Sequence, residues 1–151
     1  YMATETWLVR GQIGAGFLTG GILGATGDAA EGLETTLHYG EGIDTPRNRA
    51  FRDAYRKAYK IDPDVYAVQG YDAAQLLGAG LSAVKGDFAK RDGMIAAMGK
   101  ATIDSPRGKF TLSASHNPVQ DMFLREAVGK NNEYKGVAVK ALADPGRGCK
   151  M

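Results

Sequence analysis

Apolar residues recur with helical spacing most clearly over residues 46–60. Thr45 is a favoured N-cap residue, and Pro46 suits the first helical position. One stripe of this segment is aromatic and alanine-rich: Ala50, Phe51, Ala54, Tyr55, Ala58 and Tyr59. Most of the basic residues lie away from this stripe, as expected for a helix that is half exposed to water. Asp62 and Pro63 should stop the helix, because the residue before a proline disfavours helical backbone.

Two more helices are predicted over residues 66–84 and 91–100. The first has a face of apolar and small residues: Tyr66, Gly70, Ala73, Ala74, Leu77 and Leu81. Its small residues would let another element pack closely against it; they are Gly70, Ala73, Gly78 and Gly80. We expect Tyr55, Tyr59 and Tyr71 to pack in the core. Tyr66 begins its helix, so it suits an entry contact and a position over a ligand cleft equally well.

The remaining apolar segments are short and predict strands. We expect them near 33–38, 108–112, 121–128 and 134–140, and "WLVRGQIGAGF" predicts a further strand that ends in a glycine-rich turn. The order is a few strands, then three helices, then a run of strands. This order indicates an α/β or α+β domain without internal repeats.

Composition narrows the class of protein. The chain has 151 residues, of which 44% are hydrophobic and 24% charged, as in an ordinary globular domain. The net charge is only +2, and the basic residues are scattered among acids, so no nucleic-acid surface is expected. No apolar run approaches the roughly 20 residues that span a bilayer. Cys149 is the single cysteine, which excludes an intrachain disulfide.

The glycine-rich segment "GQIGAGFLTGG" does not fit a nucleotide-binding loop. After Gly14 and Gly16 a dinucleotide motif needs glycine at position 19, where this sequence has Thr19. No Lys-Ser or Lys-Thr pair follows, so a phosphate loop is excluded as well. A turn between two elements is the better interpretation, and no cofactor is expected.

Catalytic and metal-binding patterns are also missing from the sequence. His38 and His116 are far apart and have no cysteine or acid at metal-ligand spacing, so each is expected at the surface or in a hydrogen bond. Ser113 and Ser115 are too close to His116 in sequence to form a catalytic triad with it. We therefore expect neither a metal site nor an enzyme.

Three blocks carry a family resemblance: "GDAAEGLETTLHY", "IDTPRNRAFRDAYRKAYKIDPDVYAVQGYDAAQLLGAGL" and "DSPRGKFTLSASHNPVQDMFLRE". In order and spacing they resemble the periplasmic solute-binding proteins of branched-chain amino-acid-type ABC transporters, from about Ile13 to Val139. The resemblance implies the α/β fold of type I periplasmic binding proteins. In that fold two three-layer α/β/α lobes are joined by three hinge crossings, and the ligand lies between the lobes.

The resemblance also implies which lobe each segment joins. Residues 1–38 would belong to the second lobe, 39–121 to the first lobe, and 122–151 to the second lobe again. The chain resembles about the last two-fifths of such a protein, without most of the first lobe. Such a piece leaves sheet edges and helix faces uncovered, so we expect a homodimer or a swapped dimer.

The function implied is that of an extracytoplasmic, periplasmic solute-binding component of an ABC importer. Its partners would be a small-molecule ligand and a membrane permease. The alternative is a ligand-sensing domain of a receptor or transcriptional regulator, because the same fold serves there. A fused membrane or DNA-binding segment would distinguish the two.

Four residues are expected at the ligand by resemblance: Gly16, Phe17, Tyr66 and Gln69. Amino-acid-binding members carry an acid near the position of Gly16, where it pairs with the ligand ammonium. An unpaired buried ammonium is costly, so its absence here argues against a plain amino acid. Phe17 and Tyr66 instead favour a hydrophobic or aromatic carboxylate, with an amino acid as the other ligand class. Gln69 offers an amide hydrogen bond or lies on solvated helix surface.

Overall fold

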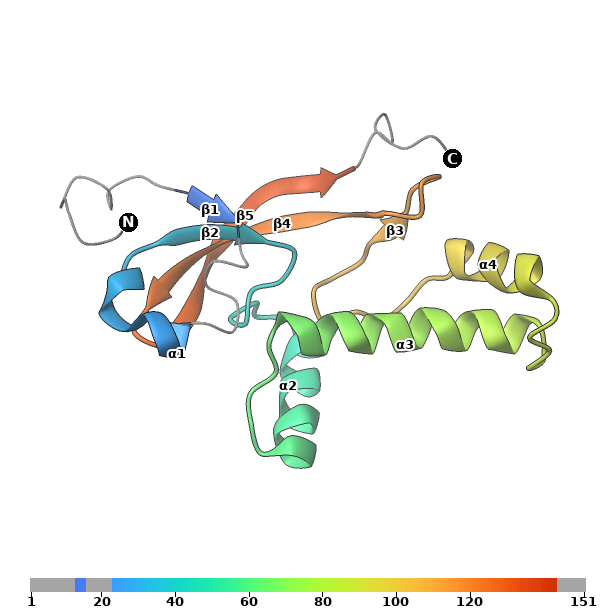
Figure 1. Ribbon diagram of the computed structural model, residues 1–151, viewed down its shortest axis with the longest axis horizontal. Coiled ribbons are helices and arrows are strands. Elements are labelled where there is room, and N and C mark those ends of the chain that lie inside the picture. The colour runs from blue at the N-terminus through green and yellow to red at the C-terminus, as the bar shows by residue number, and fades with distance from the viewer. Residues whose placement is uncertain (1–12, 16–22, 144–151) are drawn as a thin grey trace.

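The structure is a computed structural model that describes residues 13–15 and 23–143. The elements in chain order are β1 (Ile13–Ala15), α1 (Leu23–Thr26), the 3₁₀ helix η2 (Gly27–Ala30), β2 (Glu34–Leu37), α2 (Pro46–Tyr59), α3 (Val65–Ala83), α4 (Arg91–Lys100), β3 (Thr111–Leu112), β4 (Pro118–Val128) and β5 (Asn131–Leu142). Figure 1 shows most of the sheet on one side and the long helix α3, with α4 beside it, on the other. Strand β4 extends from one part to the other.

The sheet has mixed topology, with β4 as its central strand. β1 pairs in parallel with β2, and β2 pairs antiparallel with β4 at Glu34↔Glu126 through Leu37↔Phe123. β5 follows β4 in a hairpin and pairs along its other edge. The first residues of β4 instead pair with the two-residue strand β3. One strand therefore joins the main sheet to the segment that follows the helices.

Local signals fix the ends of α2 as the sequence predicts. The Thr45 side chain accepts a hydrogen bond from the Asn48 backbone N–H at 3.1 Å, and Pro46 is the first helical residue. The helix ends at Lys60, which has a left-handed φ of 62° and donates its N–H to the Arg56 carbonyl. A second side-chain cap, from Asp64, starts α3.

The main core lies where the end of β2, the start of α3 and the middle of β4 meet. Its buried members are Tyr39, Ile43, Phe51, Val65, Val68 and Phe123. Phe51 of α2 contacts Tyr71 of α3 with ring centroids 5.1 Å apart. This cluster ties both helices to the strand β4 near the point where the chain leaves β2.

Helices α3 and α4 approach closely at one glycine. A Cβ built on Gly80 would lie 2.7 Å from Met98 Cγ and 2.8 Å from Met94 Cγ, so a side chain there would force the two methionines to move. Gly70 and Gly78, by contrast, have nothing within 4 Å of the same position. The predicted close approach on α3 is therefore confirmed at Gly80.

Most predicted elements are confirmed, with ends shifted by one to three residues. One prediction about packing is wrong: Tyr59 is 64% exposed, because α2 projects beyond the core at its last turn. Tyr55 and Tyr71 are half-buried against the core, as expected. The short helices α1 and η2 were not predicted, since glycine and alanine dominate "LGATGDAA" and give it no period.

Candidate ligand-binding site

The first turns of α3 carry two of the predicted ligand-binding residues. The carboxylate of Asp64 accepts a hydrogen bond from the Ala67 N–H at 2.9 Å, which fixes where the helix begins. Tyr66 is 55% exposed in this first turn, so it is free to contact a ligand. Gln69 lies one turn later on the same side of the helix, where residues three apart are neighbours.

Gln69 is hydrogen-bonded to His38, the residue directly after β2. The amide nitrogen of Gln69 lies 3.1 Å from Nε2 of the imidazole. An amide nitrogen only donates, so Nε2 accepts and the ring proton lies on Nδ1. Burial, and then the charges of Arg107 and Arg125, lower the pKa of His38 to about 4. The imidazole is therefore neutral near pH 7 and lies in a positive field.

Arg107 is held in place by a buried ion pair with α3. Its Nε donates to Oδ2 of Asp72 at 2.8 Å, and the same oxygen accepts from the Ser105 hydroxyl at 2.9 Å. The guanidinium also bonds Gln120 of β4 and lies 4.2 Å from the centre of the Phe110 ring. Burial is the main influence on both charged partners, raising the pKa of Asp72 and lowering that of Arg107. The positive charge beside His38 is thus fixed.

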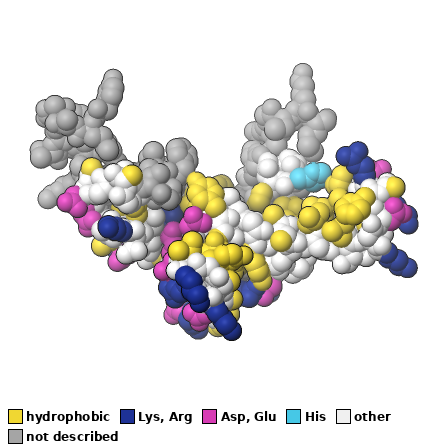
Figure 2. Space-filling model, turned by 60° about the horizontal axis from the view of Figure 1, so that its bottom comes forward, with side chains coloured by type: hydrophobic (Ala, Val, Ile, Leu, Met, Phe, Trp, Pro, Cys, Tyr) yellow, Lys and Arg dark blue, Asp and Glu magenta, His cyan; other side chains and the backbone are white. Residues whose placement is uncertain are grey.

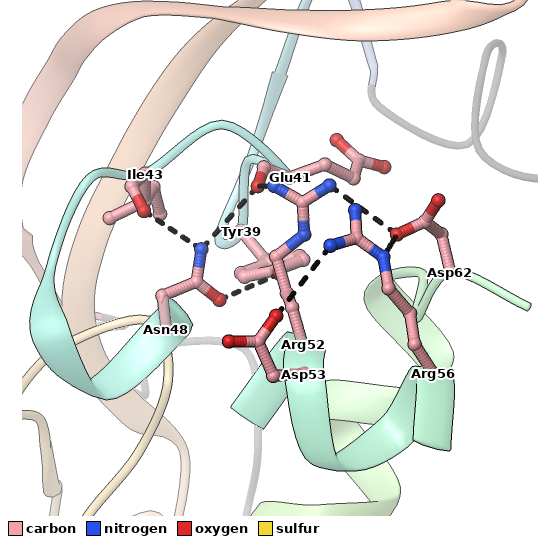
Figure 3. A network of polar contacts seen from close by, with 8 residues as sticks. All are labelled: Tyr39, Glu41, Ile43, Asn48, Arg52, Asp53, Arg56 and Asp62. Atoms are coloured by element: carbon pink, nitrogen blue, oxygen red, sulfur yellow. Dashed lines mark hydrogen bonds and ion pairs between the residues drawn. The ribbon is translucent and has the colours of Figure 1, made fainter. Parts of the chain in front are cut away.

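A second polar network holds the chain between β2 and α2 (Figure 3). The Tyr39 hydroxyl donates to Asn48 Oδ1 at 2.9 Å, and Asn48 Nδ2 donates to the Ile43 carbonyl at 2.8 Å. Arg52 donates to the Glu41 carbonyl at 2.8 Å, and burial raises the pKa of the Glu41 carboxyl. The segment after His38 is therefore held against α2.

Arg125 of β4 anchors the other side of this network. Its guanidinium is completely buried, lies 3.7 Å from the Glu41 carboxylate and donates to the Thr35 hydroxyl at 3.2 Å. Because Thr35 belongs to β2, Arg125 ties together the two strands that run beside the candidate site.

Two hollows adjoin the site. A cavity of about 40 Å³ is lined by His38, Arg107, Lys109, Gln120 and Asp121, among others, which is room for one water or one ligand oxygen. A larger, mostly apolar groove of about 460 Å³ runs between α3, α4 and the β3–β4 segment. Gln69, Arg107 and His116 are among the residues that line it.

The predicted site residues are thus brought together only in part. Tyr66 and Gln69 lie side by side on α3, whereas Gly16 and Phe17 lie outside the described residues. β1 ends at Ala15, which pairs with Thr36, so β1 and β2 end at the same edge of the sheet. Sequence analysis did not single out His38, although its position directly after a strand and before the implied crossing to the first lobe could have pointed to it.

The other candidate chemistry is not supported. His116 is exposed in the turn between β3 and β4, and Ser113 and Ser115 bond each other at 2.9 Å. Within residues 13–15 and 23–143, no cluster of histidine, cysteine or acid side chains could hold a metal ion. Among the helices described, none is both long enough and apolar enough to cross a membrane.

Comparison with protein families identifies the class. A family profile described as "Periplasmic binding protein" matches residues 9–132. The chain therefore belongs to this family, and the resemblance inferred from the three sequence blocks is confirmed. A comparison with curated proteins gave no match.

Solved structures of similar proteins show which kinds of solute-binding protein this chain is similar to. A solute-binding protein of an ABC transporter from R. palustris, solved in complex with benzoate, is 52% identical over 92% of this chain, with a TM-score of 0.85. A second, from Rhodopseudomonas palustris BisB5 with 3,4-dihydroxybenzoic acid, is 31% identical over 89% of this chain, with a TM-score of 0.74. A leucine-binding protein from Thermotoga maritima shares the fold at 20% identity over 77% of this chain, with a TM-score of 0.66.

These relatives are solute-binding transport proteins, not enzymes. The described elements match their fold, which confirms a partial α/β periplasmic-binding-protein architecture. The chain spans 39%, 38% and 33% of the length of these three structures, respectively.

Proposed function

We propose that the protein is the solute-binding component of an ABC importer and binds a small aromatic or apolar carboxylate between two lobes. The observation that carries the proposal is a neutral His38 in the positive field of Arg107 and Arg125. A hydrogen bond from Gln69 joins this histidine to α3, the helix that carries Tyr66. A positive field favours an anionic ligand group and disfavours an ammonium. An exposed aromatic side chain beside it suits a ring.

Two further lines support this ligand class. The turn at residues 14–19 has no acid to pair with an ammonium, and an unpaired buried charge is costly. The relative that is 52% identical was solved with benzoate. Gly16, Phe17, Tyr66 and Gln69 are the ligand-contacting residues in this proposal, with the aromatic pair placed against the ring.

The segments fit the proposed lobes. In this proposal residues 1–38 and 122–151 belong to the second lobe and 39–121 to the first. The pairing of β4 supports it, because its first residues pair with β3 and its later ones with β2 and β5. The buried networks of Tyr39 and Arg125 then lie at hinge crossings, where a rigid connection guides lobe closure.

The partners that we propose follow from the class of solute-binding proteins of ABC importers. The family indicates an extracytoplasmic location, and the proposal specifies the periplasm and a membrane permease as the partner that accepts the closed, loaded protein. For the 151-residue chain by itself we propose a homodimer or a swapped dimer. The support is the uncovered apolar face of α3, of which Leu77 is 45% exposed.

A ligand panel tests the function. The protein expressed from its complete open reading frame is titrated by calorimetry with benzoate, 4-hydroxybenzoate, leucine, phenylalanine and the deaminated analogues of both amino acids. We expect the acids without an ammonium to bind more tightly than the amino acids. Tighter binding of leucine or phenylalanine would overturn the carboxylate proposal, because an ammonium partner would then exist elsewhere.

A further inference from the structure

His38 joins the strand side of the site to its helix side. It follows β2 directly and accepts a hydrogen bond at Nε2 from Gln69 of α3. The other ring nitrogen, Nδ1, carries the proton, and none of the residues that the structure describes bonds it. A half-buried imidazole therefore holds one N–H donor in a fixed orientation without a protein acceptor.

We propose that His38 determines specificity in this site by donating its Nδ1–H to a carboxylate oxygen of the ligand. Gln69 is a positioning residue that fixes the imidazole tautomer through Nε2. The inference rests on the proposed function and specifies which side chain recognises the acid group.

The charges around His38 support this assignment. Arg107 and Arg125 act on the imidazole from the β3–β4 side, and Lys109 and Asp121 line the 40 Å³ cavity that His38 also lines. Arg107 is fixed by Asp72, so it adds a positive field without moving to the ligand. Three of these four charged groups are cations, so a carboxylate meets an N–H donor and net attraction. An ammonium meets a second donor, and Asp121 is the one acid among the four.

The size of the small cavity fits one end of a ligand only. At about 40 Å³ it admits a single oxygen, and the ring would have to remain outside it. Tyr66 is one helical turn from Gln69 and is 55% exposed, so its ring is available to a ligand that reaches past Gln69. The acid group would thus meet His38 after β2, and the ring would meet Tyr66 of α3.

Two amide substitutions at His38 distinguish ligand recognition through Nδ1 from recognition through Nε2. An asparagine side chain places its amide near the position of Nδ1, whereas a glutamine side chain reaches the position of Nε2. We compare His38→Asn, His38→Gln and His38→Ala in the protein expressed from the complete open reading frame, with benzoate and its neutral analogue benzamide as probes. Glu133→Gln is the control, because Glu133 is exposed on β5 and lines neither of the two hollows beside the site.

The variants are expected to differ in their affinity for benzoate. His38→Ala and His38→Gln should weaken benzoate binding roughly tenfold to a hundredfold, the effect of losing a hydrogen bond to a charged group. His38→Asn should recover most of this loss, and Glu133→Gln should leave binding unchanged. The loss should be smaller for benzamide than for benzoate, since its oxygen carries no charge.

The role of Gln69 is tested by the pH dependence of ligand affinity, which a residue with a purely structural role would not change. Wild-type affinity should stay constant from pH 5.5 to 8, because His38 remains neutral there. In Gln69→Glu a carboxylate faces Nε2, which favours a proton on that nitrogen and raises the pKa of His38. Affinity for benzoate should then become pH-dependent within this range, whereas Gln75→Glu, also on α3, should leave it constant.

The outcomes separate the inference from the proposed function. If no aromatic acid binds the wild-type protein, the proposed function fails and the inference fails with it. If benzoate binds and His38→Ala binds it equally well, the inference is overturned while the function stands. If His38→Gln recovers binding and His38→Asn does not, the ligand is recognised through Nε2, and the assignment of Nδ1 is overturned.

Discussion

Helices α2 and α3 are neighbours in sequence and in space, yet their surfaces differ in kind. α2 has an apolar stripe of which Phe51 is buried, and its outer side carries arginine and lysine (Figure 2). α3 is apolar or small around most of its circumference, and its only charged residue, Asp72, is buried. Figure 2 shows the surface along the middle of α3 as yellow and white, without charge.

The difference indicates that the two helices are adapted to different surroundings. A helix that is apolar on all sides is normally buried, whereas an amphipathic helix is stable at a surface. In this chain Leu77 of α3 is nevertheless exposed. The outer face of α2 therefore suits water, and the outer face of α3 suits contact with another protein surface.

The largest change in stability is expected when the one charged side chain of α3 is removed. Asp72→Ala should lower the free energy of unfolding by about 3–5 kcal/mol, because Arg107 would stay buried without its partner. The control is Asp53→Ala on α2, whose exposed carboxylate lies 3.7 Å from Arg56 and should cost less than about 1 kcal/mol. Both are measured by urea unfolding, and equal costs would contradict the distinction between the helices.

The second prediction compares the stability contributed by two residues of the apolar stripe of α2. Phe51→Ala should cost about 3–5 kcal/mol, since it removes a buried ring from the main core. Tyr59→Ala, eight residues later on the same stripe, should cost only about 0.5–1.5 kcal/mol, the contribution of its tilted ring contact with Tyr55, whose centroid is 4.6 Å away. Urea unfolding of both variants gives the comparison. A loss for Tyr59→Ala as large as that for Phe51→Ala would show that the end of α2 is covered in solution.

A third prediction concerns self-association of the 151-residue chain. Leu77→Lys places a charge on the uncovered face of α3 and should weaken the proposed dimer by at least about tenfold. Ala54→Lys, on the exposed side of α2, should leave it unchanged. Light scattering over a concentration series measures both. A wild-type species that remains at 16.0 kDa at every concentration would rule out the dimer.

The smallest effect is a pH dependence at the contact between His38 and α3. The pKa of His38 is lowered to about 4, so between that value and about 6.5 the unfolded chain binds a proton that the folded chain does not. This contribution to stability is therefore complete above pH 6.5 and is lost as the pH falls toward 4. Glu41 and Asp72 act in the opposite direction, because their pKa values are raised.

The variant His38→Asn isolates this contribution. The difference in unfolding free energy between wild type and His38→Asn should rise with pH from about 4 to 6.5 and then stay constant. The same measurement on His116→Asn controls for loss of a histidine elsewhere. A difference that does not vary with pH would show that His38 is as easily protonated in the folded chain as in the unfolded one.

Much of the fold was predictable because its signals are local. Thr45 and Pro46 mark the start of α2, β-branched and aromatic residues mark β2, and three blocks of sequence mark the family. Each of these features depends on residues a few positions apart, where capping, backbone preference and side-chain spacing act directly. The position of Tyr66 in a first helical turn followed from the same kind of signal.

Other features arise only from contacts between distant residues. Gln69 bonds His38 across 31 positions, and Arg107 bonds Asp72 across 35. No pattern of spacing specifies such pairs, because they depend on how β2, α3 and β4 meet in space.

The sequence by itself determined the elements, the family and the apolar character of α3. Tertiary structure decided which side of α3 packs, since a helix that is apolar all round has no preferred face. It decided that Gly80 and not Gly70 contacts α4, and that Tyr59 extends past the core. It also brought His38 to Gln69 and into the field of two arginines, because burial and charge are properties of the folded arrangement and not of the sequence alone.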